Sequence, residues 1–222
     1  MLTAFREIRE LIVHGRMAPG TLVLEGDLAD RLNMSRTPVR AAIQLLQRDG
    51  YVLGQRGPTK SRMIVAPLTK EDANELYLII GRIECIAGRN AAVRPAEIRE
   101  KLTNELENIN KHLLFIANDK GIANQIFELD RNFHRAIVNV GAGSRLSTLH
   151  QAIEPQAERY WRLYASSIAD DLHLSVAEHS NVVDALRRGD ACAVERSLQM
   201  NWVKGAERLG QVIDIFGERG SW

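Results

Sequence analysis

The segment from Leu22 to Val65, LVLEGDLADRLNMSRTPVRAAIQLLQRDGYVLGQRGPTKSRMIV, predicts two short helices, a tight turn and a two-stranded wing. Leucines recur at helical spacing until Asn33-Met34, and Ser35 can cap a second helix that begins there. The predicted buried side of that helix consists of Val39, Ile43 and Leu46, with Leu45 beside it. Two short strands follow, at residues 51–53 and 63–65, joined by a tip that contains glycine and proline. This order of elements is typical of a winged helix-turn-helix, a structure that binds DNA.

Basic residues gather in the same segment. Between Arg31 and Arg62 the chain has seven basic residues and one acidic residue. A solvated helix face would also carry arginines, but these lie at the N-terminal end of a capped helix after a short turn, which is the end that enters the major groove. We therefore predict DNA contacts from Arg31, Ser35, Arg36, Thr37 and Arg40. If the wing resembles that of known winged helix-turn-helix proteins, Arg56 and Gly57 approach the minor groove.

The rest of the chain differs from this front part in charge. Residues 1–66 have 10 basic and 6 acidic residues, whereas residues 67–222 have 19 and 22. Pro67 ends the last wing strand and Thr69 can cap the helix that follows, so we place a domain boundary between residues 66 and 67. No apolar run approaches the ~20 residues of a membrane-spanning helix. We expect a cytoplasmic protein that contacts no membrane.

Residues 67–222 show helical periodicity almost throughout. Breaks at glycine, proline and aspartate divide the stretch into six predicted helices: 70–92, 96–118, 121–140, 144–168, 173–188 and 190–216. The predicted fold class is mainly α, with an N-terminal winged helix-turn-helix followed by a six-helix antiparallel bundle.

Few residues of the predicted bundle carry chemistry. Asp130 and His134 are four positions apart and therefore project from one face of a helix, where an oxygen and a nitrogen can bind the same cation. The same spacing also occurs when a carboxylate accepts a hydrogen bond from a core histidine. His179 lies on the apolar side of another helix, where a histidine is usually a core residue with its hydrogen bonds satisfied.

A family resemblance adds to this reading of the residues. LIVHGRMAPGTLVLEGDLADRLNMSRTPVRAAIQLLQRDGYV resembles the DNA-binding domain of the GntR family of bacterial transcriptional regulators through its PG, SRTPVR and DG motifs. One position departs from the family pattern: Gly26 stands where an arginine that touches the operator is common. That contact is therefore not carried over to this chain.

The later segments LDRNFHRAIVNVGAGSRL and EHSNVVDALRRGDACAVERSLQMN are similar to the FCD effector domain of the FadR branch of that family. Six helices resemble its VanR-type subgroup. The resemblance implies a divalent metal (zinc, nickel or manganese) bound by Asp130, His134 and His179. Asn201 stands at the fourth ligand position, where a histidine is usual. An amide oxygen is a weaker ligand than imidazole, and the alternative is a hydrogen-bonded polar cluster without an ion.

The resemblance also implies a small-molecule effector, expected to be an organic acid. The arginine that commonly precedes Glu84 by four residues is replaced by Ile80, which weakens the case for an acid with several carboxylates. Tyr77, Ile80, Tyr160 and Trp161 are the predicted effector contacts, and all four can equally be core residues.

These features together indicate a homodimeric repressor, not an enzyme, that binds a palindromic double-stranded operator under effector control. Two alternatives stay open at this point. One is a constitutive DNA-binding dimer with an inert bundle, and the other is a metal-dependent hydrolase that uses the aspartate and histidine cluster.

Overall fold

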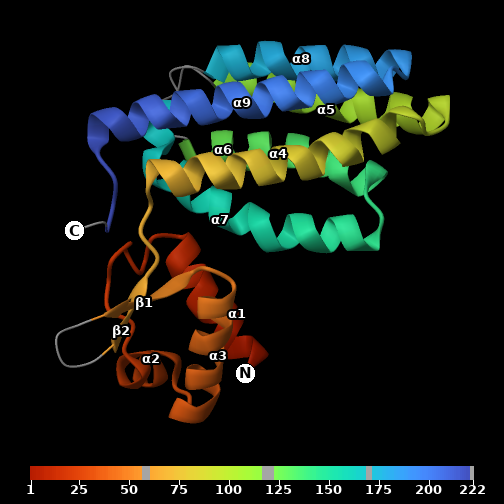
Figure 1. Cartoon of the computed structure of the whole chain (residues 1–222). Helices are drawn as coiled ribbons and strands as arrows, with labels where there is room; N and C mark the ends of the chain where they lie inside the picture. The colour runs from red at the N-terminus through yellow and green to blue at the C-terminus, as the bar shows by residue number, and fades with distance from the viewer. Residues whose placement is uncertain (57–60, 117–122, 169–171, 221–222) are drawn as a thin grey trace.

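A computed structural model describes residues 1–56, 61–116, 123–168 and 172–220. Its described elements form a small N-terminal head of helices and a hairpin, and a larger helical bundle above it (Figure 1). The predicted fold class, mainly α with a winged helix-turn-helix and a helical bundle, is confirmed. Among the described residues, no helix is both long enough and apolar enough to cross a membrane.

The head consists of α1 (Leu2–Val13), α2 (Glu25–Leu32), α3 (Arg36–Arg48) and the strands β1 (Val52–Arg56) and β2 (Ser61–Val65). Asn33 ends α2 in the left-handed conformation, with φ 52°, and so turns the chain towards α3. Ser35 is the N-cap residue of α3 as predicted, but its side chain makes no capping hydrogen bond. The strands are antiparallel, with Val52 paired to Val65, and are longer than the predicted 51–53 and 63–65.

The head has a hydrophobic core of its own. The predicted buried residues of α3, Val39, Ile43 and Leu46, are at most 4% exposed and pack in one cluster with Ile8 of α1 and Val52 of β1. This packing turns the opposite side of α3 towards solvent.

The bundle consists of α4 (Lys70–Ala92), α5 (Ala96–Ile116), α6 (Ala123–Gly141), α7 (Ser144–Ile168), α8 (Leu172–Arg188) and α9 (Ala191–Phe216). All six predicted helices are present, with ends within a few residues of the predicted ones. Thr69 caps α4 as expected, because its Oγ1 accepts a hydrogen bond from the backbone N–H of Asp72 at 3.2 Å.

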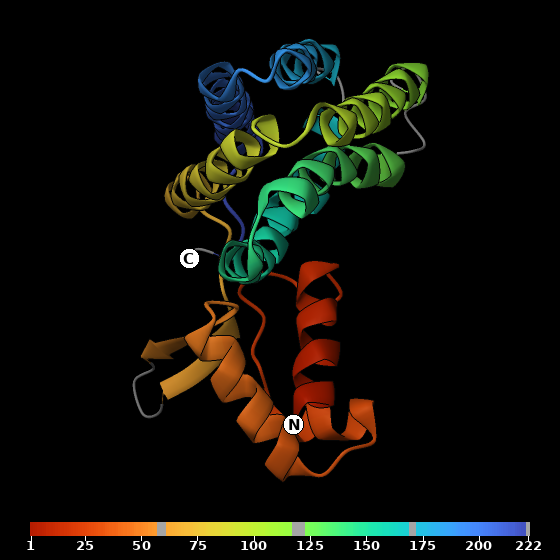
Figure 2. The ribbon, with the colours of Figure 1, turned by 90° about the vertical axis from the view of Figure 1, so that its right-hand side faces the viewer.

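Helix α4 lies at the centre of the bundle and contacts α6, α7, α8 and α9. Its approach to α6 is very close: a Cβ on Gly141 of α6 would lie 1.9 Å from the carbonyl oxygen of Ala87 on α4. Only glycine permits this contact, which brings the C-terminal end of α6 next to α4. Helix α7 is the bundle helix that lies against the head (Figures 1 and 2).

Candidate functional sites

The exposed side of α3 carries the residues predicted to contact DNA. Ser35, Arg36, Thr37 and Arg40 are exposed, and Arg31 is exposed at the C-terminal end of α2. Of the predicted wing residues, Gly57 and the side chain of Arg56 lie outside the described part of the structure. The helix end therefore presents two arginines, a hydroxyl pair and the positive pole of its dipole to one side of the head.

Glu25, at the first turn of α2, holds one of these arginines. The Nε atom of Arg40 donates to both carboxylate oxygens of Glu25 at 3.0 Å, and Nη2 lies 2.8 Å from Oε2. The hydrogen bond from Arg40 lowers the pKa of Glu25, and the same interaction raises the pKa of Arg40. The sequence analysis missed this pair because its members are 15 residues apart, a separation that carries no local pattern.

Gly26 leaves space beside the second arginine. A Cβ at residue 26 would lie 3.8 Å from Nη2 of Arg36, so the guanidinium of Arg36 extends back over α2 at this position. The two arginines of α3 thus both lie against the first turn of α2. Arg40 is held there by an ion pair, and Nη2 of Arg36 lies at van der Waals distance from the position of a Cβ on residue 26.

A second cluster of chemical groups lies inside the bundle. Asp130 and His134 project from α6 and His179 from α8, and one ligand atom from each lies within 4.8 Å of the others. The imidazole of His179 stacks on Phe133 with ring centroids 3.8 Å apart, which fixes its plane. The two histidine rings are nearly perpendicular, with centroids 5.4 Å apart. The three residues thus lie together, and their role as metal ligands stays a prediction.

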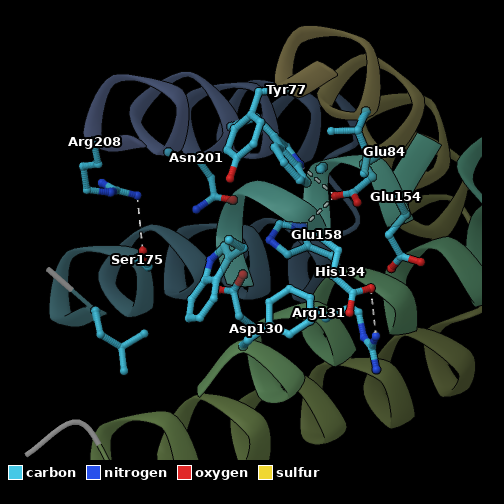
Figure 3. Close-up of a pocket in the computed structure, with 17 residues that line it drawn as sticks. Tyr77, Glu84, Asp130, Arg131, His134, Glu154, Glu158, Ser175, Asn201 and Arg208 are labelled. Atoms are coloured by element: carbon cyan, nitrogen blue, oxygen red, sulfur yellow. Dashed lines mark hydrogen bonds and ion pairs between the residues drawn. The ribbon is translucent and has the colours of Figure 1, made fainter. Parts of the chain in front are cut away.

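Each of the two imidazole rings is oriented by a hydrogen bond at its Nδ1 atom. Nδ1 of His134 donates to Oε2 of Glu84 at 2.6 Å, and Nδ1 of His179 lies 3.1 Å from Oδ1 of Asn110 (the first pair is visible in Figure 3). A carboxylate or amide oxygen can only accept, so Nδ1 is the protonated atom of each bond. The Nε2 atom is therefore the one that His179 has available, with its lone pair, for a further partner.

The Nε2 atom of His179 departs from the usual hydrogen bonding of buried polar atoms. Nε2 of His179 is buried and has no hydrogen-bond partner in the described part of the chain, and the nearest acid is Asp130, with Oδ1 at 3.6 Å. Buried polar atoms are nearly always paired, and an orphaned one indicates a missing water or ion.

The charges of the cluster are unequal. Burial lowers the pKa of His179 well below its ordinary value, and the charge of His134 lowers it further, so His179 is neutral. Burial also opposes a charge on His134, but the carboxylate of Glu84 outweighs it and raises the pKa of His134 to about 9. Burial raises the pKa of Asp130. The cluster thus presents a neutral imidazole nitrogen and a poorly compensated carboxyl group to the same space.

These properties fit a divalent cation. A neutral Nε2 lone pair and a buried carboxyl group are donors that such an ion takes. The 4.8 Å limit on their separations is slightly more than twice a typical metal–nitrogen bond of about 2.1 Å. Modest side-chain rotations would therefore bring Asp130, His134 and His179 into ligand distance of one ion, and His134, which Glu84 keeps protonated in the metal-free protein, would release the proton of its Nε2 to bind it.

Asn201, the proposed fourth ligand, lies on α9 at the wall of the same cavity. Its Nδ2 donates to Oε2 of Glu178 at 2.9 Å, so the amide nitrogen is already hydrogen-bonded within the protein. Its carbonyl oxygen is the atom that a cation would use. Its role as a ligand stays a prediction.

The cavity next to the cluster has a volume of about 90 Å³ (Figure 3). Tyr77, Ile80 and Trp161 line it as predicted for effector contacts. Tyr160 does not, and its assignment as an effector contact is corrected. Its hydroxyl donates to Oδ2 of Asp72 at 2.5 Å and accepts from the N–H of Thr69 at 3.0 Å, on a different side of α7. Successive helical residues point about 100° apart, so Tyr160 and Trp161 face different surroundings.

The sequence analysis also missed the group at the centre of this polar network. Glu84 of α4 is 1% exposed and accepts hydrogen bonds from His134, from Nε2 of His150 at 2.9 Å and from Nε1 of Trp202 at 2.8 Å. Burial alone would raise its pKa, but the two histidines lower it to about 2. The available signal was a glutamate on the core face of α4, within a run of apolar residues.

Two family descriptions match the chain: "Bacterial regulatory proteins, gntR family" over residues 2–58 and "FCD domain" over residues 75–201. The chain belongs to the GntR family and has an FCD domain. GntR proteins are DNA-binding transcriptional regulators, so the chain is a regulator and not an enzyme, and the hydrolase alternative is excluded. The assignment to the VanR-type subgroup stays a prediction.

Relatives with curated names extend over nearly the whole chain. The HTH-type transcriptional repressor RspR of Escherichia coli strain K12 is 28% identical over 210 residues, covering 94% of this chain and 88% of that protein. A probable D-xylose utilization operon transcriptional repressor of Paenarthrobacter nicotinovorans is 28% identical over 201 residues, covering 88% and 84%. Both are named as repressors.

Solved structures share the fold of this GntR protein. Escherichia coli McbR/YncC superposes with a TM-score of 0.70 at 21% identity, covering 95% of this chain and 96% of that one. A GntR transcriptional regulator from Rhodococcus sp. RHA1 gives a TM-score of 0.68 at 20% identity, covering 94% and 96%.

Proposed function

We propose that this GntR protein is a homodimeric cytoplasmic repressor that binds a palindromic operator, with its affinity controlled by a small organic acid bound beside a divalent metal in the bundle. In this proposal residues 1–66 are the DNA-binding domain and residues 67–222 the effector-binding and dimerisation domain. The observation that carries the sensing part is the buried, unpaired Nε2 atom of His179 opposite Asp130.

The exposed end of α3 supports the DNA-binding part. Each subunit would insert this helix into the major groove of one half-site, with Arg36 and Arg40 at base edges or adjacent phosphates. Ser35 and Thr37 would bind phosphate, with Arg31 beside them and Arg56 and Gly57 at the minor groove. The ion pair with Glu25 limits the rotamers of Arg40, so less freedom is lost when it binds DNA.

The donor set supports the metal. Asp130, His134 and His179 would bind it, with Asn201 in the fourth position, and zinc, nickel and manganese all accept such ligands. The bound ion would supply a positive centre for a carboxylate. Glu84 accepts the hydrogen bond from Nδ1 of His134 and would fix the orientation of this ligand.

The residues that line the cavity indicate which kind of acid it would bind. Its two arginines are already engaged by carboxylates: Arg131 with Glu128 and Glu158, and Arg208 with Glu178. Aromatic side chains from four helices form much of the remaining wall: Tyr77, Phe127, Trp161 and Trp202. These features favour an acid with one carboxylate at the metal and an aromatic or otherwise apolar body, over an acid with several carboxylates.

An apolar surface supports the dimer. Leu78 and Ile86 of α4 and Met200 and Val203 of α9 are 42–58% exposed, and these two helices lie side by side (Figure 1). Exposed apolar side chains at this density mark interaction sites. Leu78→Asp should yield monomers in light scattering, whereas Leu114→Asp on α5, which changes a side chain of similar exposure, should leave the dimer intact.

Elemental analysis of the purified protein, followed by metal titration after chelation, tests the sensing part. The expected result is one divalent ion per subunit, lost in His134→Ala. A DNA fragment selected from a random pool by the protein then serves to measure operator affinity with candidate aromatic acids. A protein that binds this fragment, takes up no metal and responds to no acid would be the constitutive dimer with an inert bundle.

A further inference from the structure

Helix α7 contacts both the cavity and the head. Glu154, Glu158 and Trp161 line the cavity. Glu154 is held by both nitrogens of the Arg135 fork at 2.6 Å, and Trp161 packs on Phe127 with ring centroids 5.1 Å apart. A molecule bound in the cavity would therefore touch this side of α7 and change how it packs on α6.

The residues between these positions face the head. Nε2 of Gln156 donates to the backbone carbonyl of Asp49 at 2.8 Å, and Nη2 of Arg159 donates to the carbonyl of Ala66 at 2.5 Å. Asp49 is the C-cap of α3, and Ala66 directly follows β2. Both ends of the segment that joins α3 through the wing to the bundle are thus fastened to one face of α7.

Arg159 is an unusual residue for such a place. It is 5% exposed. In the described part of the chain, no carboxylate oxygen lies within 4.0 Å of a nitrogen of its guanidinium. Asp72 attracts it only from a greater distance. A buried charge without a close counter-ion opposes folding, so packing alone does not account for an arginine here.

The geometry of α3 converts a movement at Asp49 into one at the DNA-binding end. The helix has 13 residues and is therefore about 20 Å long. A tilt of about 5° at its C-cap would move the end that carries Arg36 by about 1.7 Å. Hydrogen bonds to bases do not tolerate such a displacement.

We propose that Arg159, at the end of the wing, and Gln156, at the C-cap of α3, are the positioning residues through which the packing of α7 against the cavity sets the orientation of α3. The proposal rests on the proposed function in one respect, namely that the cavity receives the effector. It assigns to Arg159 the transmission of the signal and not the binding of effector or DNA.

The experiment perturbs the cavity side of α7 by mutation, so it needs no effector. Glu154→Gln removes the charge that holds Arg135 and keeps the size of the side chain. Hydrogen exchange of the full-length protein, read at backbone amides 46–52, should change about fivefold or more, the lower range of coupling between sites. In the double variant with Arg159→Met this change should disappear.

Two further variants serve as controls. Arg145→Met makes the same substitution at an exposed position of α7, and in its presence the response to Glu154→Gln should be that of the wild type. Arg159→Lys keeps a donor for Ala66 and should restore the response. If Arg159→Met fails to fold, Gln156→Leu provides the same test at the Asp49 carbonyl.

The inference is overturned if Glu154→Gln leaves amides 46–52 unchanged, or if its effect survives Arg159→Met. Titration of the wild type with Zn²⁺ tests the metal site of the proposed function separately. Zn²⁺ binding by a protein whose amides 46–52 do not respond to Glu154→Gln would refute the relay and leave the metal site standing. Failure to bind Zn²⁺, with the Glu154→Gln response intact, would refute the metal site and leave the relay standing.

Discussion

Asn201→His is the substitution that most sharply tests the chemistry of the cavity. Asn201 lies at the cavity wall with its amide nitrogen bonded to Glu178. A histidine there would replace a neutral amide oxygen with an imidazole nitrogen, a stronger donor to zinc and nickel. We expect the variant to bind these metals more tightly than the wild type.

Two opposing effects set the size of the change. The variant loses the 2.9 Å hydrogen bond from Asn201 to Glu178, which lowers the stability of the metal-free protein by about 1 kcal/mol. Glu178 keeps its bonds from Arg208 at 2.9 and 3.0 Å, so its charge is not left unpaired. An additional imidazole ligand should tighten metal binding about tenfold, by analogy with the size of outer-shell effects.

These values predict a thermal shift. At a metal concentration of about 100 times the wild-type Kd, the ion stabilises the wild type by about 2.7 kcal/mol and the variant by about 4.1 kcal/mol. For a chain of this size 1 kcal/mol corresponds to about 2–4 °C. Zinc should therefore raise the Tm of Asn201→His by about 3–6 °C more than that of the wild type.

Differential scanning fluorimetry of chelator-treated protein with added zinc, nickel or manganese measures this difference, and calorimetric titration gives the Kd. Asn181→His, which adds a histidine at an exposed position of α8, is the matched control and should behave as the wild type. If neither the wild type nor Asn201→His gains stability with any of the three metals, the cluster is a polar core and the proposed cavity chemistry is wrong.

Other predictions address different parts of the molecule. Arg40→Ala should weaken operator binding by about 1–3 kcal/mol if the guanidinium meets a base edge, measured by fluorescence anisotropy; unchanged affinity in a folded variant would remove it from the interface. A fragment of residues 67–222 should be helical by circular dichroism and fail to bind the operator, and an unfolded fragment would refute the domain division. His134→Ala should blunt the response to an effector more than it weakens basal DNA binding, since His134 lies in the bundle. In metal-free protein the free energy of unfolding should fall as pH rises from about 6.5 towards 9. The reason is that burial opposes a charge on His134 but Glu84 outweighs it and raises the pKa of His134 to about 9. Urea denaturation at pH 6 and pH 9 measures this difference, and equal stabilities would contradict the prediction.

Local patterns were sufficient for the order of the elements and for part of the site. The spacing of apolar residues along α3 identified its buried side, and the four-residue spacing of Asp130 and His134 placed both on one face of α6. The approach of His179 was expected only through the family resemblance, because nothing in the local sequence relates α6 to α8. Tyr160 was misassigned because helical periodicity does not say which neighbouring element covers each buried side of a helix.

The amino-acid sequence by itself thus determined which elements form, which of their faces are apolar, and that a DNA-binding head precedes a helical bundle, since these depend on interactions between residues near one another in the chain. Only the tertiary structure decided what those faces meet. It placed Glu84 between His134 and His150, left Nε2 of His179 without a hydrogen-bond partner among the described residues, and joined Arg159 to Ala66 by a hydrogen bond. Such contacts depend on the relative positions of whole helices, which packing across the entire bundle fixes and no local pattern encodes.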